Sequence, residues 1–232
     1  MTQEKVWENE YRNSKFLTKE NKPQSDVVRF VQFLRKEEGV VLEGLRVLDL
    51  GSGTGRNSFY FAEFSCKVLG LEISETAIKI AEENIKNSKD HIMYDISYIM
   101  QSIGEKFPVG DDSQDIVLDI TSSNSLTEAE REVYLAETHR VLKSGGYFFV
   151  KALCKDGDAN AKHLLKHFPG KEKDTYIMPD MNVVERVWAK DDFVKTYDKY
   201  FKILKLEKKT SYTRMNDRSY KRNFWICYMK KE

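Results

Sequence analysis

Apolar and polar positions follow two different periods along the first two thirds of the chain. Short apolar runs, which are typical of buried strands, lie at 45–50, 67–72, 96–102, 114–120 and 147–153. Before and between these runs, apolar residues recur every three or four positions, as in amphipathic helices, at 23–39, 55–64, 74–87 and 127–142. The last of these segments opens with the capping-box spacing of Thr127 and Glu130. The pattern therefore predicts strands and helices in regular alternation.

This alternation ends after residue 153. Residues 155–187 are mostly polar, a helix is expected near 191–200, and two long strand-like runs cover 201–213 and 221–231. Consecutive strands with a short polar connection pair as an antiparallel hairpin, whereas parallel neighbours need crossover helices. We therefore predict an α/β fold with a doubly wound sheet of seven strands, mostly parallel, and the C-terminal hairpin at its edge.

The composition is that of an ordinary globular domain. Of 232 residues, 32% are charged and 41% are hydrophobic, so the chain can bury one large core. No apolar run approaches the roughly 18 residues of a membrane helix, and the first residues lack a signal-peptide core. We therefore expect a cytoplasmic protein without a membrane partner. Cys66, Cys154 and Cys227 are far apart and lack metal-binding spacing, so neither a disulfide framework nor a metal site is expected.

Charge is distributed unevenly in this chain of net charge +1. Residues 43–140 hold 18 Asp and Glu against 9 Lys and Arg, whereas residues 201–232 hold 10 Lys and Arg against 3 Asp and Glu. The basic segment has two interpretations: lysines on the solvent face of strands, or a surface that attracts phosphates. No aromatic and basic RNA-binding motif accompanies the lysines, which favours the first interpretation.

The stretch VLDLGSGTGRNS, residues 47–58, places three glycines directly after the first expected strand. At the carboxyl edge of a parallel sheet the following helix offers unpaired N–H groups, and glycine lets a ligand approach them closely. A turn that needs glycine for tight packing alone is the alternative. Dinucleotide sites favour G-x-G-x-x-G, but Arg56 stands where the last glycine is expected. Glu72, 21 residues after Gly51, is placed to accept hydrogen bonds from both hydroxyls of a ribose, which favours a nucleoside ligand.

Taken together, these motifs resemble those of the class I S-adenosylmethionine-dependent methyltransferases. VLDLGSGTG resembles the first motif of that family, GLEIS its ribose-binding motif and RVLKSGGYFFV its post-strand signature, all within residues 45–153. The resemblance implies a Rossmann-like fold and an enzyme that uses S-adenosyl-L-methionine and releases S-adenosyl-L-homocysteine. GRNS, together with VWENEYRN near the N-terminus, further resembles small-molecule methyltransferases of the tellurite-resistance and thiopurine type.

The resemblance assigns cofactor-binding roles by position. It implies that the methionine end of the cofactor lies against Asp49, Gly51, Ser52, Gly53, Gly55, Arg56 and Asn57. It places the ribose at Glu72, the adenine at Ile73, Ser102 and Ile103, and the methyl group near Asp119. Arg56 is a candidate partner of the methionine carboxylate, or else a solvated side chain at a helix start. Ser102 departs from the family pattern, which often has Asp at this position.

The sequence assigns no catalytic residue. Methyl transfer from a sulfonium is an in-line displacement that needs a positioned nucleophile in a dry pocket, so a general base is optional. We interpret residues 1–232 as one domain with an N-terminal helical cap (1–40), a cofactor-binding core (45–153), an insertion or lid (155–187) and a C-terminal helix with a hairpin (190–232). The lid and the segment around Trp7 are expected to choose the acceptor, with candidate contacts at Tyr11, Tyr176 and Met178.

Three functions stay open at this point. The leading hypothesis is a methyltransferase that acts on a small molecule. The second is a methyltransferase that acts on RNA or protein, which the basic C-terminal segment favours. The third is a nucleoside-binding protein without catalytic activity.

Overall fold

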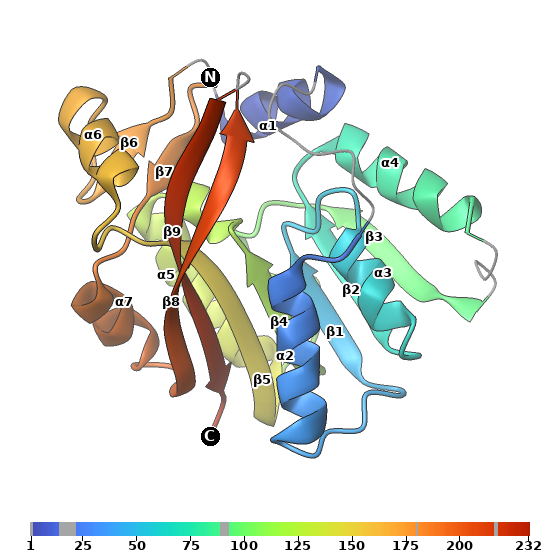
Figure 1. The fold of residues 1–232 in the computed structure, drawn as a ribbon. Coiled ribbons are helices and arrows are strands. Elements are labelled where there is room, and N and C mark those ends of the chain that lie inside the picture. The colour runs from blue at the N-terminus through green and yellow to red at the C-terminus, as the bar shows by residue number, and fades with distance from the viewer. Residues whose placement is uncertain (1, 14–21, 89–92, 180, 216–217) are drawn as a thin grey trace.

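One sheet of seven strands forms the centre of the computed structural model, which describes residues 2–13, 22–88, 93–179, 181–215 and 218–232. The strands are β1 (Arg46–Leu50), β2 (Lys67–Glu72), β3 (Asp95–Met100), β4 (Gln114–Ile120), β5 (Leu142–Leu153), β8 (Lys202–Met215) and β9 (Arg218–Lys230). They lie in the order β3-β2-β1-β4-β5-β9-β8 (Figure 1). Pairs among β1 to β5 are parallel, and β9 is antiparallel to β5 and to β8. The predicted mixed, doubly wound sheet is therefore confirmed.

Helices cover both faces of this sheet (Figure 1). They are α1 (Gln3–Arg12), α2 (Ser25–Lys36), α3 (Arg56–Ala62), α4 (Glu75–Lys86), α5 (Glu128–Val141) and α7 (Lys190–Tyr197). Apolar side chains of α2 and α3 pack on one face, and those of α5 and α7 pack on the other. Helix α1 lies against α4. Within the described ranges, no helix combines the length and the apolar character needed to cross a membrane.

The segment between β5 and α7 has secondary structure of its own. It contains α6 (Ala159–His167) and a small antiparallel sheet of β6 (Thr175–Ile177) and β7 (Val184–Arg186). The sequence predicted only a mostly polar connection here. Several of its apolar side chains, among them Tyr176, Val183 and Val187, are buried and join the core on the α2 face, whereas Phe168 and Ile177 are exposed. A small number of anchors is thus enough to order a polar segment.

Strand β5 begins five residues earlier than its sequence pattern indicates. The sequence pattern ends the helix at 142 and starts the strand at 147, but the run Ser144-Gly145-Gly146 between them lies inside β5, where the register with β4 shifts between Gln114 and Ile116. Gly145 has φ +77°, and a Cβ on Gly146 would lie 2.9 Å from the carbonyl oxygen of Lys143. Glycine therefore permits a bulge that continues α5 directly into the strand.

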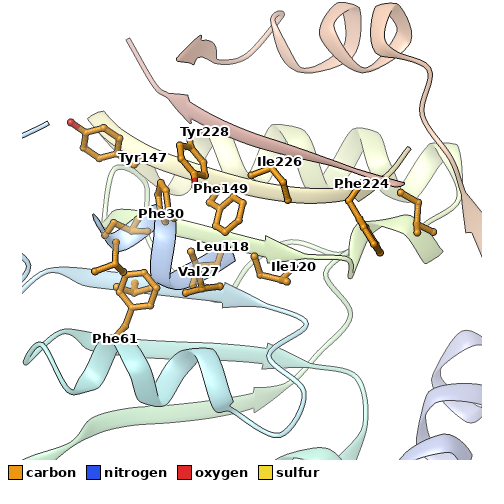
Figure 2. Close-up of a cluster of buried hydrophobic side chains, with 14 of the residues drawn as sticks. Val27, Phe30, Phe61, Leu118, Ile120, Tyr147, Phe149, Phe224, Ile226 and Tyr228 are labelled. Carbon is orange, nitrogen blue, oxygen red and sulfur yellow. The ribbon is translucent and has the colours of Figure 1, made fainter. Parts of the chain in front are cut away.

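Aromatic residues fill the core on the α2 face of the sheet, as Figure 2 shows. The ring of Phe30 lies 4.9 Å, between centroids, from those of Phe149 in β5 and Tyr228 in β9. Phe148, the neighbour of Phe149, points to the opposite face and packs against Phe201 at 5.1 Å. Because β5 is buried on both faces, it has a continuous apolar run instead of an alternating pattern.

The capping box at the start of α5 gives a direct test of this local structure. The Thr127 hydroxyl accepts the Glu130 N–H, and the Glu130 carboxylate accepts the Thr127 N–H at 2.8 Å. We expect Thr127→Ala to lower the free energy of unfolding by about 1 kcal/mol, because a helix N–H loses its acceptor. Thr127→Ser keeps the hydroxyl and should stay near wild type. Equal losses for both variants in urea unfolding would contradict the capping role.

Candidate functional site

A cavity of about 480 Å³ lies at the carboxyl edge of the parallel strands. The segments that follow β1, β2, β3 and β4 each line part of it. The segment after β1 contributes Gly51 to Thr54, Arg56 and Asn57, and the segment after β2 contributes Ile73. The segment after β3 contributes Gln101 to Ile103, and the segment after β4 contributes Thr121, Ser122, Ser125 and Leu126. Helix α1 adds Gln3, Trp7 and Tyr11. The cavity is therefore where a sheet of this topology binds ligands, with a helix from the start of the chain beside it.

The glycine turn after β1 presents bare backbone to this cavity. Gly51 and Gly53 have φ +68° and +56°, in the left-handed region that other residues rarely adopt. A Cβ on Gly51 would overlap the Ser122 side chain, and one on Gly53 would lie 2.7 Å from the Tyr11 hydroxyl oxygen. Any side chain at either position would therefore displace its neighbours and fill space at the edge of the cavity.

Glu72 supports this turn from below. Its Oε2 accepts the Gly53 N–H at 2.8 Å, and its Oε1 accepts the N–H groups of Ile73 and Ser74 at 2.8 and 2.9 Å. Burial raises the pKa of Glu72 above its usual value, although these three bonds oppose the rise. A carboxylate offers about four acceptor positions, so about one is left for a ligand. The sequence predicted hydrogen bonds from both hydroxyls of a ribose and did not reveal the three backbone bonds.

Two further carboxylates, Asp49 and Asp119, lie buried beneath the cavity. Burial raises the pKa of Asp49 to about 6, with a contribution from the charges of Glu72 and Asp119, and burial also raises the pKa of Asp119. Asp49 accepts a hydrogen bond from Ser58 and Asp119 accepts one from Tyr134, each at 2.6 Å. Three acidic groups at neighbouring strand ends favour a positively charged ligand. The residues present therefore fit the ammonium and sulfonium groups of S-adenosylmethionine.

The structure brings most of the expected site residues together. Those that line the cavity are Tyr11, Gly51, Ser52, Gly53, Arg56, Asn57, Glu72, Ile73, Ser102 and Ile103. Asp49, Gly55 and Asp119 belong to the neighbouring strand ends and turn but are not part of its lining.

Tyr176 and Met178, the expected acceptor contacts, lie away from the cavity in the apolar core. The Tyr176 hydroxyl donates to Glu185 Oε2 at 2.6 Å and accepts from Arg222 at 2.5 Å. Burial raises the pKa of Tyr176 well above its usual value, so the hydroxyl stays protonated. Arg222 lies 46 residues after Tyr176, in β9, and a local sequence pattern does not reveal a contact between residues so far apart.

Several lining residues were not predicted: Gln3, Gln24, Thr54, Ile80, Asn84, Gln101, Ile120, Thr121, Ser122, Ser125, Leu126 and Glu130. Gln101 and Thr121 directly follow β3 and β4, so the rule that ligands bind at carboxyl strand ends identifies them. Gln3 and Gln24 reach the cavity through the docking of α1 and α2, for which the sequence carries no local signal.

Glu8 holds α1 in place beside the cavity. Its carboxylate accepts hydrogen bonds from the hydroxyls of Ser74 and Thr76, both at 2.6 Å, and from the Thr76 N–H at 3.1 Å. Ser74 is the N-cap of α4, so Glu8 lies at the positive end of that helix. Burial alone would raise the pKa of Glu8, but these bonds and one from Arg12 outweigh it and lower the pKa to about 2.

The sheet order, with the reversed strand β9 beside β5 and a cavity at the carboxyl edge, defines the fold of the class I S-adenosylmethionine-dependent methyltransferases. The model of the methyltransferase domain family matches residues 42–201. The chain therefore belongs to this family.

Known proteins show how far the likeness extends. An uncharacterized methyltransferase of Synechocystis is 32% identical over 120 residues, which are 52% of this chain and 52% of that protein. The ribosomal protein L11 methyltransferase of Halalkalibacterium halodurans is 30% identical over 131 residues, which are 55% of this chain and 38% of that protein. The chain thus spans about half, or less, of the length of these curated relatives.

Likeness to a solved structure covers more of the chain. The 1,6-didemethyltoxoflavin-N1-methyltransferase of Burkholderia thailandensis, solved with bound 1,6-didemethyltoxoflavin and S-adenosylhomocysteine, superposes with a TM-score of 0.68 at 14% identity. The match covers 98% of this chain and 86% of that one. At this level of identity, the likeness shows a shared fold.

The attachment of α1 through Glu8 can be measured. We expect Glu8→Ala to lower the hydrogen-exchange protection factors of α1 about tenfold at pH 7, because hydrogen bonds to a charged group contribute ~1.5 to 3 kcal/mol each when buried and less at this partly exposed position. Protection of β1 should not change. Glu4→Ala, at an exposed position on the same helix, is the matched control.

The pH dependence has a defined sign. Because the folded pKa of Glu8, about 2, lies below the usual value of 4.5, the attachment is fully present above pH 4.5 and is lost as the pH falls toward 2. Equal protection of α1 in the Glu8 and Glu4 variants would show that α1 is held by other contacts.

Proposed function

We propose that this protein transfers the methyl group of S-adenosyl-L-methionine to a small-molecule acceptor and releases S-adenosyl-L-homocysteine. The observation that carries this proposal is that a bare glycine turn and the buried Glu72 carboxylate meet in one cavity at the carboxyl edge of the sheet. Membership of the methyltransferase domain family supports the same reaction.

Each part of the cofactor has a matching part of the cavity. The remaining acceptor position on Glu72 Oε2 suits a ribose hydroxyl, and Ile73 and Ile103 offer apolar surface to the adenine. The bare backbone at Gly51 and Gly53 leaves room for the methionine portion. These assignments follow the chemistry of the groups that line the cavity.

When bound, the cofactor supplies a methyl group on a sulfonium, which a nucleophile displaces in line. The residues of the chain provide position and environment. Asp49, Glu72 and Asp119 offset the positive charge of the ligand, and Trp7 and Tyr11 on α1 exclude water from the cavity. Positioning of this kind supplies a large part of the rate of a displacement, so we assign no general base.

A small acceptor fits the size of the site. A cavity of about 480 Å³ lies in the range typical of small-molecule sites and has α1 along one side. The 1,6-didemethyltoxoflavin-N1-methyltransferase, which shares the fold, was solved with bound 1,6-didemethyltoxoflavin. Tyr11 stays a candidate acceptor contact, and the tellurite-resistance or thiopurine likeness stays a prediction.

A macromolecular acceptor is the second candidate, because one curated relative is a ribosomal protein methyltransferase. The basic C-terminal lysines give it limited support. Lys202, Lys205 and Lys209 form ion pairs with Glu232, Glu207 and Asp26, which reduces the charge that a polyanion would meet. Salt-dependent retention on RNA would favour this candidate, whereas absence of turnover despite cofactor binding would favour a non-catalytic nucleoside-binding protein.

We keep the division into a cap (1–40), a core (45–153), an insertion (155–187) and a C-terminal unit (190–232) as a proposal. The cap contributes α1 to the cavity, whereas none of the described residues of the insertion line it. The insertion does contact the start of α5, where the Glu128 N–H donates to Glu172. A lid role for residues 155–187 therefore stays a prediction that requires movement toward the cavity.

The proposed function is tested by ligand binding and turnover. Calorimetry should show binding of S-adenosylhomocysteine and no binding of NADH, because Arg56 stands where the G-x-G-x-x-G pattern of dinucleotide sites has its last glycine. Incubation of a metabolite extract with methyl-labelled cofactor should then transfer label to a small molecule. Binding of NADH without binding of either sulfur nucleoside would overturn the proposal.

Glu72→Ala tests the ribose assignment. We expect the affinity for S-adenosylhomocysteine to fall at least about tenfold, because a hydrogen bond to a charged group is worth ~1.5 to 3 kcal/mol. Glu72→Gln keeps one carbonyl oxygen for the backbone N–H groups and covers the case in which the Ala variant fails to fold. Glu75→Ala, at an exposed position three residues away, is the control. Wild-type affinity in a folded Glu72 variant would place the ribose elsewhere.

A further inference from the structure

Gln24 and Asn57 are amide side chains that line the cavity, and each has its carbonyl oxygen occupied. The Gln24 backbone N–H donates to Asn57 Oδ1 at 3.1 Å, and Lys151 Nζ donates to Gln24 Oε1 at 3.2 Å. An ammonium and a backbone N–H can only donate, so these contacts determine which end of each amide is the oxygen. Asn57 is only 6% exposed, yet neither NH2 group donates to any described residue.

Lys151 is itself fixed from two other directions. Its Nζ lies 3.0 Å from Asp26 Oδ2 and 4.7 Å from the centre of the Phe224 ring. Asp26 is almost fully buried and is also bound by Lys209 Nζ at 2.5 Å. With these contacts Lys151 has little freedom to move, and the Gln24 amide cannot reverse without turning its NH2 group toward an ammonium.

Beside the two NH2 groups, the cations Lys151 and Lys209 share the single carboxylate of Asp26. Arg56 lines the cavity next to Asn57, and its charge acts on Lys151 together with that of Lys209. Strand β5, which carries Lys151, lies two strands from β1 and three from β2, whose end holds Glu72. The donors are therefore at the end of the cavity away from the proposed ribose position.

We propose that Gln24 and Asn57 form a subsite for a carboxylate or a similar negatively polarised oxygen, and that Lys151 is the positioning residue that keeps the Gln24 NH2 group available to it. The inference rests on the proposed function, in which such an oxygen has two sources. One is the carboxylate of the cofactor's methionine, and the other is an oxygen of the methyl acceptor. Donors that are fixed in advance bind such an oxygen at a low ordering cost.

Asn57→Asp tests the subsite, because it keeps the acceptor for the Gln24 N–H and replaces the NH2 donor with an oxygen. The probes are S-adenosylhomocysteine and 5′-methylthioadenosine, which has the same nucleoside and a thioether but no carboxylate. The subsite is assigned to the cofactor carboxylate if the affinity for S-adenosylhomocysteine falls about tenfold or more while the affinity for 5′-methylthioadenosine falls less than about twofold. Asn87→Asp, at an exposed position, controls for the added charge.

The second source is tested with sodium benzoate, a simple aromatic carboxylate. If Asn57→Asp changes neither nucleoside affinity, benzoate should shift the side-chain NH2 signals of Gln24 and Asn57 in nitrogen-15 NMR spectra of the homocysteine-loaded protein. Loss of the benzoate-induced shift of the Gln24 NH2 signal in the variant assigns the subsite to the acceptor. Unchanged affinities with no benzoate shift overturn the proposal, as do equal losses for both nucleosides.

Lys151→Met and Lys151→Arg test the positioning role. The Met variant releases the Gln24 amide and should lower the affinity for S-adenosylhomocysteine about threefold to tenfold. An Arg side chain, like Lys, can only donate, so the Arg variant should keep the wild-type affinity. Equal affinities in the two variants, with equal loss of thermal stability, would mean that Lys151 is only structural. If the wild type binds neither nucleoside, the proposed function fails, and benzoate titration of the unloaded protein still decides whether the subsite exists.

Discussion

The carboxylate of Glu72 joins the backbone segments that form the floor of the cavity. From the end of β2 it accepts one N–H from the glycine turn and two from the residues that lead into α4. A buried acceptor with three donors has one favoured position, because any movement leaves backbone N–H groups unpaired in a low-dielectric environment. The shape of the turn and the entry into α4 therefore both depend on this side chain.

The same segment connects the floor of the cavity to the helix beside it. Ser74 donates its N–H to Glu72 and its hydroxyl to Glu8, so the two carboxylates share one residue. Helix α1 buries only Val6 and Glu10, and polar contacts are a large part of its attachment. Helix α2, by contrast, buries Val27, Phe30, Val31, Phe33 and Leu34. If either helix moves when ligands enter, the weaker apolar packing makes α1 the one that does.

Sequence patterns predicted the sheet and the floor of the cavity because both are local. Periodicity identifies the strands, and the rule for carboxyl strand ends places Gly53 and Glu72 together. The patterns failed where contacts join distant segments. Tyr176 was predicted to contact the acceptor but is bound by Arg222, and no pattern singled out Gln24 as a residue of the cavity. The strand pattern also missed Gly145 and Gly146 as part of β5, because glycine permits a bulge but pairing with the neighbouring strand determines where it forms.

The charges around the cavity differ between its two ends. Glu72 in β2 and Asp49 in β1 make one end of the cavity acidic, and Asp119 lies in β4, between them and β5. Burial raises the pKa of all three carboxyl groups. Toward β5, the positive charges of Arg56 and Lys151 offset the acidic groups. There the amide oxygens of Gln24 and Asn57 accept hydrogen bonds from Lys151 and from the Gln24 N–H, which leaves both NH2 groups as donors. A ligand that carries positive charge at one point and a carboxylate at another lowers the energy of both ends at once. Such a zwitterionic ligand reduces the repulsion among buried carboxylates that the folded chain otherwise retains, so binding and electrostatic relief at this site are the same event.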